Sequence, residues 1–232
     1  MTTFNVQMLW QGQYHDWLFS GLQTSLALTA IAFVLALPLA MGIALLRLSS
    51  SIALRWLGTL YVEAIRNVPL LAHLLFWYFG APELLPNSAK EWLYAHNAEF
   101  MCAAVAMTLY AAAYMSEDIR SGIRAVPAAQ TQAAMALGLS HLATLRFIVL
   151  PQAIRLTIPP LISQTLNLWK DSSIATVIGV GELMYQAARV ETATFRSTEA
   201  FSFVTLSYLG VSLLIAGAAA WYQHQQPVRL QR

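Results

Sequence analysis

Two long stretches without a charged residue constrain the fold of this chain more than any other feature of its sequence. Residues 17–46 and 201–228 contain no Asp, Glu, Lys or Arg. Each stretch is longer than the ~20 residues with which an α-helix crosses the hydrocarbon layer of a membrane. Shorter apolar runs lie between them, at residues 67–82, 100–116 and 147–169. We therefore expect an all-α membrane protein with about five transmembrane helices.

The composition supports this expectation and excludes several other classes of protein. Only 10% of the 232 residues are charged, whereas soluble domains carry about 25%, so charge is too sparse to cover a surface in water. The net charge is +2 and the basic residues are scattered singly, which excludes a nucleic-acid interface. Cys102 is the single cysteine, which excludes an internal disulfide and a cysteine metal site. We interpret residues 1–232 as one transmembrane domain in contact with membrane lipid.

The distribution of lysine and arginine predicts the orientation of the chain. With the N-terminus outside, the inner segments hold eight of these residues and the outer segments hold four. Basic residues favour the cytoplasmic side, so we expect an outer N-terminus and a cytoplasmic C-terminus. Residues 83–99 then form an outer loop with a surface helix, and residues 117–146 form a long inner segment.

This inner segment has the pattern of a compact helix–turn–helix, at about residues 124–151. Pro127 suits the first turn of a helix, and Gly138 ends that helix as a residue that tolerates left-handed backbone. We also expect the two helices to approach closely at Gly138. Ser140 is placed to cap a second helix, which ends at Pro151. Alanines at positions 133, 134 and 136 make a smooth face on which another protein can pack with little side-chain reordering.

The same segment resembles the EAA loop of permeases from ATP-binding-cassette importers. The resemblance is carried by Gln132-Ala133-Ala134, Gly138, Ile148 and Leu150-Pro151 in that spacing. Residues 61–71, 113–130, 150–161 and 170–173 are similar to permeases for polar amino acids of the histidine and glutamine type. Residues 66–69, 82–86 and 167–170 look most like the glutamate/aspartate permease subunits. Two departures are Gln132 in place of the usual glutamate and Ala129 in place of the usual glycine.

The resemblance implies a multi-pass protein of the bacterial inner membrane that works within an importer for polar amino acids, with glutamate and aspartate as the expected cargo. It implies an identical or homologous second permease subunit, an ATPase subunit that docks on the EAA loop, and a periplasmic binding protein. The chain has no GxxxxGK[ST] loop, so we expect no enzymatic activity and no bound cofactor, with ATP used by the ATPase. The implied ATPase-coupling residues are Gln130, Gln132, Ala133, Ala134, Gly138 and Pro151.

Two other classes of function fit the sequence less well. A self-contained secondary transporter would need more spans, internal repeats and paired ionisable groups at the membrane midplane. An intramembrane enzyme would need a catalytic set. His73 lies alone in an apolar run, and Glu117 and Asp118 are adjacent and face different sides of a helix. The other histidines are dispersed without metal-binding spacing, so we expect no catalytic and no metal site.

Polar residues inside or next to the expected spans are candidates for the substrate path. They are Arg66, Arg155, Ser163, Gln164, Asn167, Lys170 and Ser172. Their helical spacing puts Ser163 and Asn167 on one stripe with Gln164 beside it, facing either the pore or a partner subunit. Arg155 is interpreted as a pore contact or a structural clamp, and Arg66 as a pore residue or the partner of Glu63. Lys170 either attracts a substrate carboxylate, pairs with Asp171 or extends to the lipid headgroups.

Overall fold

Four helical segments long and apolar enough to cross a membrane dominate the fold. The computed structural model describes residues 9 and 12–225, and these form helices and turns without a strand. The four segments are α1 (Gly12–Leu48), α5 (Ala98–Arg124), the helical run His141–Ile178, which contains α8 (Leu150–Asp171), and α10 (Ser197–Gln225). They contain the apolar stretches predicted at residues 17–46, 100–116, 147–169 and 201–225, whereas residues 226–228 of the last stretch lie outside the described residues.

The fifth predicted span, at residues 67–82, is not among these four segments. The chain there forms α3 (Leu70–Leu75), a π-helical turn (Phe76–Gly80) and a 3-10 turn (Ala81–Leu84), with 6, 5 and 4 residues respectively. Before it, where the sequence predicts an inner segment, the chain forms the 15-residue helix α2 (Ile52–Arg66). Pro69 separates α2 from α3, because proline has no N–H and disfavours helical backbone in the residue before it.

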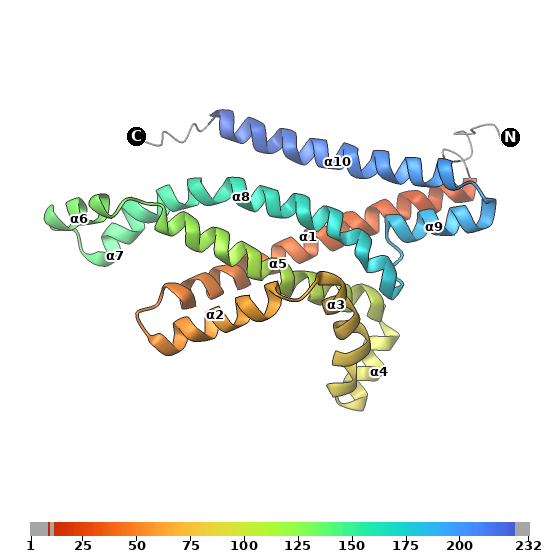
Figure 1. The fold of residues 1–232 in the computed structure, drawn as a ribbon, viewed down its shortest axis with the longest axis horizontal. Coiled ribbons are helices and arrows are strands. Elements are labelled where there is room, and N and C mark those ends of the chain that lie inside the picture. The colour runs from red at the N-terminus through yellow and green to blue at the C-terminus, as the bar shows by residue number, and fades with distance from the viewer. Residues whose placement is uncertain (1–8, 10–11, 226–232) are drawn as a thin grey trace.

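Together, α2 and α3 return the chain across the molecule, so α1 starts at one end and α10 finishes at the other (Figure 1). The turn between α1 and α2 lies at the same end as α6 and α7, and α9 (Leu183–Thr194) lies at the opposite end. Arg47, Arg124 and Arg146 belong to the segments of the first end, which we call the basic end.

Small residues allow the long helices to pack closely, as is common between helices in membranes. The buried core of α1 includes Ala32, Ala36 and Ala40, and it packs against α5. Where α5 crosses α8, Gly122 faces the Thr157 side chain and the Ala153 carbonyl. A Cβ added at Gly122 would lie 2.0 Å from Thr157 Oγ1 and 3.2 Å from the carbonyl oxygen. This crossing therefore requires glycine.

A buried carboxylate joins three helices at the end opposite the basic end. Glu182 is fully buried and caps the N-terminus of α9. Its oxygens accept hydrogen bonds from Met184 N (2.9 Å), Tyr185 N (2.8 Å), Tyr208 Oη (3.1 Å) and Ser25 Oγ (3.3 Å). Burial raises the pKa of Glu182, although these donors favour its ionised form. The four bonds hold α1, α9 and α10 together, and sequence analysis assigned Glu182 no role.

At the basic end, two short helices meet at a glycine turn. α6 (Ala128–Ala136) ends in a Schellman motif, in which Leu139 N donates to Ala134 O (3.1 Å) and Gly138 N donates to Met135 O (3.0 Å). Gly138 has a φ of +88°, and a Cβ there would meet nothing within 4 Å. The predicted close approach of the helices at Gly138 is therefore wrong. The left-handed backbone is what requires glycine.

The second short helix continues into α8 without ending at Pro151, contrary to the sequence prediction. Ser140 Oγ accepts from Ala143 N (3.3 Å) at the start of α7 (His141–Thr144). A π-helical turn (Leu145–Val149) then leads directly into α8, whose first turn contains Pro151. The wider π turn before Pro151 leaves room for its ring, which would otherwise clash with the preceding carbonyls.

Candidate functional site

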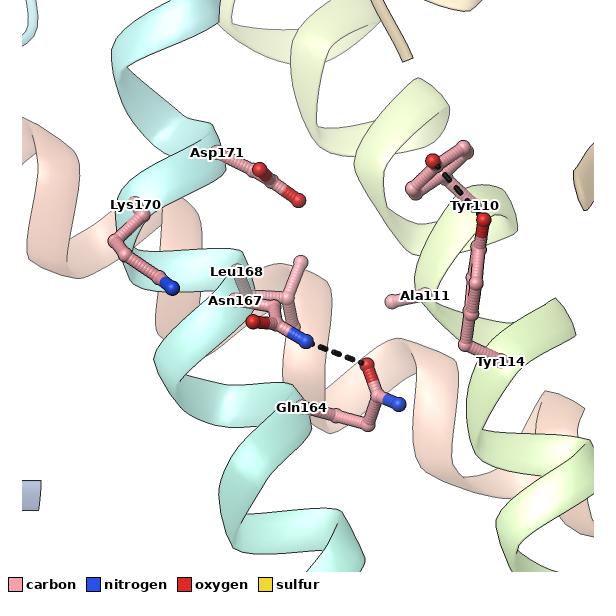
Figure 2. Close-up of a pocket in the computed structure, with 8 residues that line it drawn as sticks. All are labelled: Tyr110, Ala111, Tyr114, Gln164, Asn167, Leu168, Lys170 and Asp171. Atoms are coloured by element: carbon pink, nitrogen blue, oxygen red, sulfur yellow. Dashed lines mark hydrogen bonds between the residues drawn. The ribbon is translucent and has the colours of Figure 1, made fainter. Parts of the chain in front are cut away.

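A polar cavity of about 300 Å³ lies between α5 and α8. Its lining residues are Tyr110, Ala111, Tyr114, Gln164, Asn167, Leu168, Lys170 and Asp171. Figure 2 shows the α8 side chains Gln164 and Asp171 extending toward α5, from which Tyr110 and Tyr114 face them. Binding pockets for small molecules start at about this volume, so the cavity suits a ligand the size of an amino acid.

Hydrogen bonds fix the orientation of most polar groups in this cavity. The hydroxyls of Tyr110 and Tyr114 lie 3.2 Å apart and bond to each other. Asn167 Nδ2 donates to Gln164 Oε1 (3.4 Å), and Gln164 Nε2 donates to Asp118 Oδ2 (3.0 Å). The lining therefore presents phenol and amide groups in set positions.

Lys170 and Asp171 add one charge of each sign to the same cavity. Within the described part of the chain, neither side chain forms an ion pair within 4.0 Å. The structure thus shows no pairing of Lys170 with Asp171, one of the three interpretations of Lys170. The ammonium and the carboxylate are available to groups of opposite charge on a ligand.

Three arginines surround the carboxylate of Glu117, which follows Tyr114 on α5. We call Glu117, Arg47, Arg66 and Arg120 the Glu117 cluster. Arg47 Nη1 donates to Glu117 Oε1, Arg120 Nη2 donates to Oε2 (2.6 Å), and Arg66 Nη1 lies 3.9 Å from Oε1. The cluster joins the ends of α1 and α2 to α5. Asp118 faces Gln164 instead, so Glu117 and Asp118 have different partners, as their adjacent positions predict.

The interpretation of Arg66 as the partner of Glu63 is wrong. The Glu63 carboxylate accepts from Asn67 Nδ2 (3.0 Å), while Arg66 points to Glu117 and lies over the ring of Tyr114, 4.8 Å from its centroid. A guanidinium over an aromatic face is a favourable contact. Arg66 therefore lies one side chain away from the cavity, because Tyr114 lines it.

The other candidates for the substrate path do not line this cavity. Ser163 is exposed and donates to Pro159 O (3.3 Å). Ser172 is buried and donates to Trp169 O (2.8 Å). Arg155 is exposed, and among the described residues it has no ion pair that would support the clamp interpretation.

Sequence analysis missed three of the polar lining residues, Tyr110, Tyr114 and Asp171. The two tyrosines are four residues apart and therefore on one helix face, which was an available signal. Asp171 was considered only as a partner for Lys170, because sequence alone does not show that α8 turns its last residue toward α5.

His73 contacts Tyr110 at 5.8 Å between ring centroids. The part of the chain covered by the structure holds no group of three or more His, Cys, Asp or Glu placed for a metal.

The residues assigned to ATPase coupling form a largely exposed surface at the basic end. Exposed positions are Gln130, Gln132, Ala133, Gly138 and Pro151, whereas Ala134 is buried. Gln152 Nε2 donates to Gln130 Oε1, which ties α8 to α6. Leu137 and Leu142 are 83% and 75% exposed on either side of the Gly138 turn. Exposed apolar side chains of this kind mark a surface for protein contact.

Membrane-length helices, a cavity between two of them and an exposed helix pair at the basic end are features expected of a membrane permease. The chain belongs to the family described as binding-protein-dependent transport system inner membrane component, which matches residues 36–226. It is therefore a multi-pass protein of the inner membrane and a component of a transport system.

Individual relatives cover most of the chain. The glutamate/aspartate import permease protein GltJ of Escherichia coli (strain K12) is 35% identical over 206 residues, which are 87% of this chain and 84% of the relative. The probable glutamine ABC transporter permease protein GlnM of Bacillus subtilis (strain 168) is 38% identical over 211 residues, 90% of this chain and 92% of the relative. A solved structure described as an amino acid ABC transporter with histidines has a TM-score of 0.85 and 29% identity, with 97% of this chain and 100% of that chain covered.

Proposed function

We propose that this chain is the permease subunit of an ATP-binding-cassette importer that carries polar amino acids, with glutamate and aspartate as its cargo. The observation that carries the proposal is the cavity between α5 and α8, which presents an unpaired ammonium and an unpaired carboxylate beside fixed amide and phenol groups. An α-amino acid carries the complementary pair of charges. The relatives, which include a glutamate/aspartate permease and a probable glutamine permease, support the substrate class.

The charges around the cavity favour an acidic amino acid. Four cations and three carboxylates line the cavity, contact a lining residue or belong to the Glu117 cluster. They are Lys170, Arg66, Arg47 and Arg120 against Asp171, Asp118 and Glu117. One positive charge remains, and glutamate or aspartate carries one net negative charge. Matched charges offset the loss of hydration when an ionic substrate enters a site away from bulk water.

The transport cycle needs partner subunits, and the exposed surfaces suggest where two of them bind. We assign the helix pair α6–α7, with exposed Leu137 and Leu142, to the ATPase subunit. The binding protein approaches the opposite end of the bundle, at which α9 lies (Figure 1). A second permease, identical or homologous, completes the pore. The chain binds no cofactor, and ATP is hydrolysed by the ATPase.

The orientation of the bundle is tested by cysteine labelling. In a Cys102→Ala background, single cysteines at Asn87, the start of α4 (Asn87–Ala95), and at Gln225, the end of α10, are expected to label from opposite sides of the membrane. Asn87 labels with an impermeant reagent added to intact spheroplasts, and Gln225 labels only after the membrane is opened. Labelling of both positions from one side contradicts the three passages through the membrane that α5, the run containing α8, and α10 make between them.

The substrate assignment is tested at Lys170. Lys170→Gln removes the ammonium that contacts the substrate α-carboxylate and is expected to lower uptake of glutamate and glutamine at least tenfold, because a charge-assisted contact contributes about 1.5–3 kcal/mol. Basal ATPase activity of the complex stays unchanged. Uptake of radiolabelled amino acids into proteoliposomes is measured and normalised to the amount of permease.

Lys170→Arg is the matched variant that keeps the charge and is expected to retain most uptake. Lys90→Gln is the control, since Lys90 lies in α4 and pairs with Glu83 at 2.5 Å. Normal uptake by Lys170→Gln after normalisation would remove this cavity from the substrate path. Uptake that follows an ion gradient without ATP would contradict the importer class.

A further inference from the structure

We propose that Asp118, which lies outside the lining of the cavity, determines which group Asn167 presents to the substrate. Asp118 fixes the amide of Gln164, and the fixed amide makes Asn167 present its carbonyl oxygen, an acceptor for the α-ammonium group. Asp118 is thus a positioning residue that acts through Gln164. This inference rests on the proposed function and deepens it, and it concerns a group that all α-amino acids share.

Three side chains form a chain of hydrogen bonds that runs from α5 to the cavity wall, and we call it the Asp118 relay. Gln164 Nε2 donates to Asp118 Oδ2 (3.0 Å), and Asn167 Nδ2 donates to Gln164 Oε1 (3.4 Å). Gln164 and Asn167 line the cavity. Asp118 is half-buried on α5, and within the described part of the chain it forms no ion pair within 4.0 Å. Its carboxylate is therefore held by Gln164 and by no cation at contact distance.

The chemistry of Asp118 sets the direction of the Asp118 relay. An ionised carboxylate has acceptors and no donor, whereas a primary amide has an oxygen on one side and an NH2 group on the other. Gln164 must therefore turn its NH2 group to Asp118, which leaves its oxygen facing Asn167. Asn167 must in turn direct its own NH2 group to that oxygen. The hydrogen-bond network thus decides which atom of each amide points where.

The carbonyl oxygen of Asn167 is the free end of the Asp118 relay. Figure 2 shows this oxygen pointing away from Gln164, and no described residue donates a hydrogen bond to it. Asn167 is exposed and lies one helical turn before Asp171, on the same face of α8. These two residues offer a neutral and a charged acceptor to one ammonium group, which has three N–H donors. Lys170 remains for the carboxylate of the substrate.

The test measures binding to the purified permease–ATPase complex, without binding protein, by isothermal titration calorimetry. The ligands are glutamate and 2-hydroxyglutarate, in which a hydroxyl replaces the ammonium. Asn167→Leu removes the acceptor and is expected to raise the Kd for glutamate at least about tenfold, the factor of a hydrogen bond to a charged group, and that for 2-hydroxyglutarate by less. In Asp118→Asn, the new amide accepts either orientation of Gln164. Half of the molecules then present the wrong group, and the Kd for glutamate is expected to rise about twofold without weaker binding of 2-hydroxyglutarate.

The double variant Asp118→Asn/Asn167→Asp separates an acceptor at residue 167 from a donor. It keeps the net charge and places a carboxylate, which can only accept, at the cavity, so it is expected to bind glutamate at least as tightly as the wild-type complex. Asn87→Asp is the matched control, because Asn87 begins α4 and does not line the cavity, and it is expected to change neither Kd.

Three results would overturn the role of Asp118 and leave the proposed function standing. The first is a loss of glutamate binding in the double variant, which would show that Asn167 presents its NH2 group. The second is an equal loss of both ligands in Asp118→Asn, which would show a purely structural effect, and the third is no loss of glutamate binding in that variant. Absence of glutamate binding to the wild-type complex overturns the proposed function itself.

Discussion

Replacing Gly122 with alanine is expected to lower the free energy of unfolding of the permease by about 3 kcal/mol, near the upper end of the usual cost of overpacking a core. The new Cβ would lie 2.0 Å from Thr157 Oγ1. Thr157 is held in place, since it is buried and its hydroxyl donates to Ala153 O at 2.7 Å. The helices α5 and α8 must therefore separate at their crossing. Equilibrium unfolding of the detergent-solubilised protein measures the loss.

Two further variants separate this contact from a general effect of alanine in a membrane helix. Gly210→Ala in α10 is the control, because a Cβ there meets nothing within 4 Å. The double variant Gly122→Ala/Thr157→Ala removes Thr157 Oγ1, the atom nearest to the new Cβ. We expect it to recover about half of the lost free energy of unfolding, as measured by a double-mutant cycle. Full stability of Gly122→Ala alone would show that α5 and α8 pack differently. Because these helices carry the two walls of the cavity, the variant is also expected to reduce transport.

The second large effect is expected at Gly138, where leucine should reduce substrate-stimulated ATP hydrolysis about tenfold while insertion and pairing of the permease remain intact. A non-glycine residue with left-handed backbone costs about 1–2 kcal/mol, so the Schellman turn opens and α6 moves relative to α7. The ATPase then meets an altered surface. ATPase activity of the reconstituted complex is measured with and without loaded binding protein.

Asparagine is the matched variant at Gly138, because it adopts left-handed backbone at low cost, and it is expected to retain most activity. No described atom lies within 4 Å of a Cβ at Gly138, so a side chain that begins there meets no neighbour within this chain at its first carbon. Gln132→Glu restores the residue usual in the family loop and is expected to be tolerated. Coupled ATP hydrolysis at the wild-type rate in Gly138→Leu would remove the turn from the coupling mechanism.

The long apolar stretches were predictable because a membrane imposes a simple requirement on length and charge. The predicted stretches at residues 17–46 and 100–116 lie within α1 and α5, and the predicted run at 147–169 lies within α8 and the π turn before it. The passage made by α2 and α3 was less predictable. α2 carries charges within its sequence and α3 is short, so neither satisfies the criterion alone. Only packing against α1 and α5 shows that the two act together.

The candidate site was only partly predictable, because charges in a membrane choose partners from distant parts of the chain. Gln164 and Asn167 were found from their helical spacing and Lys170 from its charge, and the structure places all three at the cavity. The pairing of Glu63 with Arg66 was the nearest choice in sequence. Arg66 instead meets Glu117, 51 positions further along the chain. Helical spacing shows which residues share a face of one helix, whereas the cavity is formed by residues of two helices, so spacing alone does not reveal its lining.

The continuous helical run from α7 through the π turn into α8 has a consequence for energy exchange between subunits. α8 alone has 22 residues and is about 33 Å long at 1.5 Å per residue, with the surface assigned to the ATPase at one end and Gln164, Asn167 and Lys170 towards the other. Two ligands that bias the same structural element are thermodynamically linked, and the linkage is reciprocal. If docking of the ATPase changes the affinity of the cavity for its amino acid by some factor, the amino acid changes the affinity of the permease for the ATPase by that same factor. Under the proposed function, an amino acid in the cavity would then act on the assembly of the subunits as well as being transported.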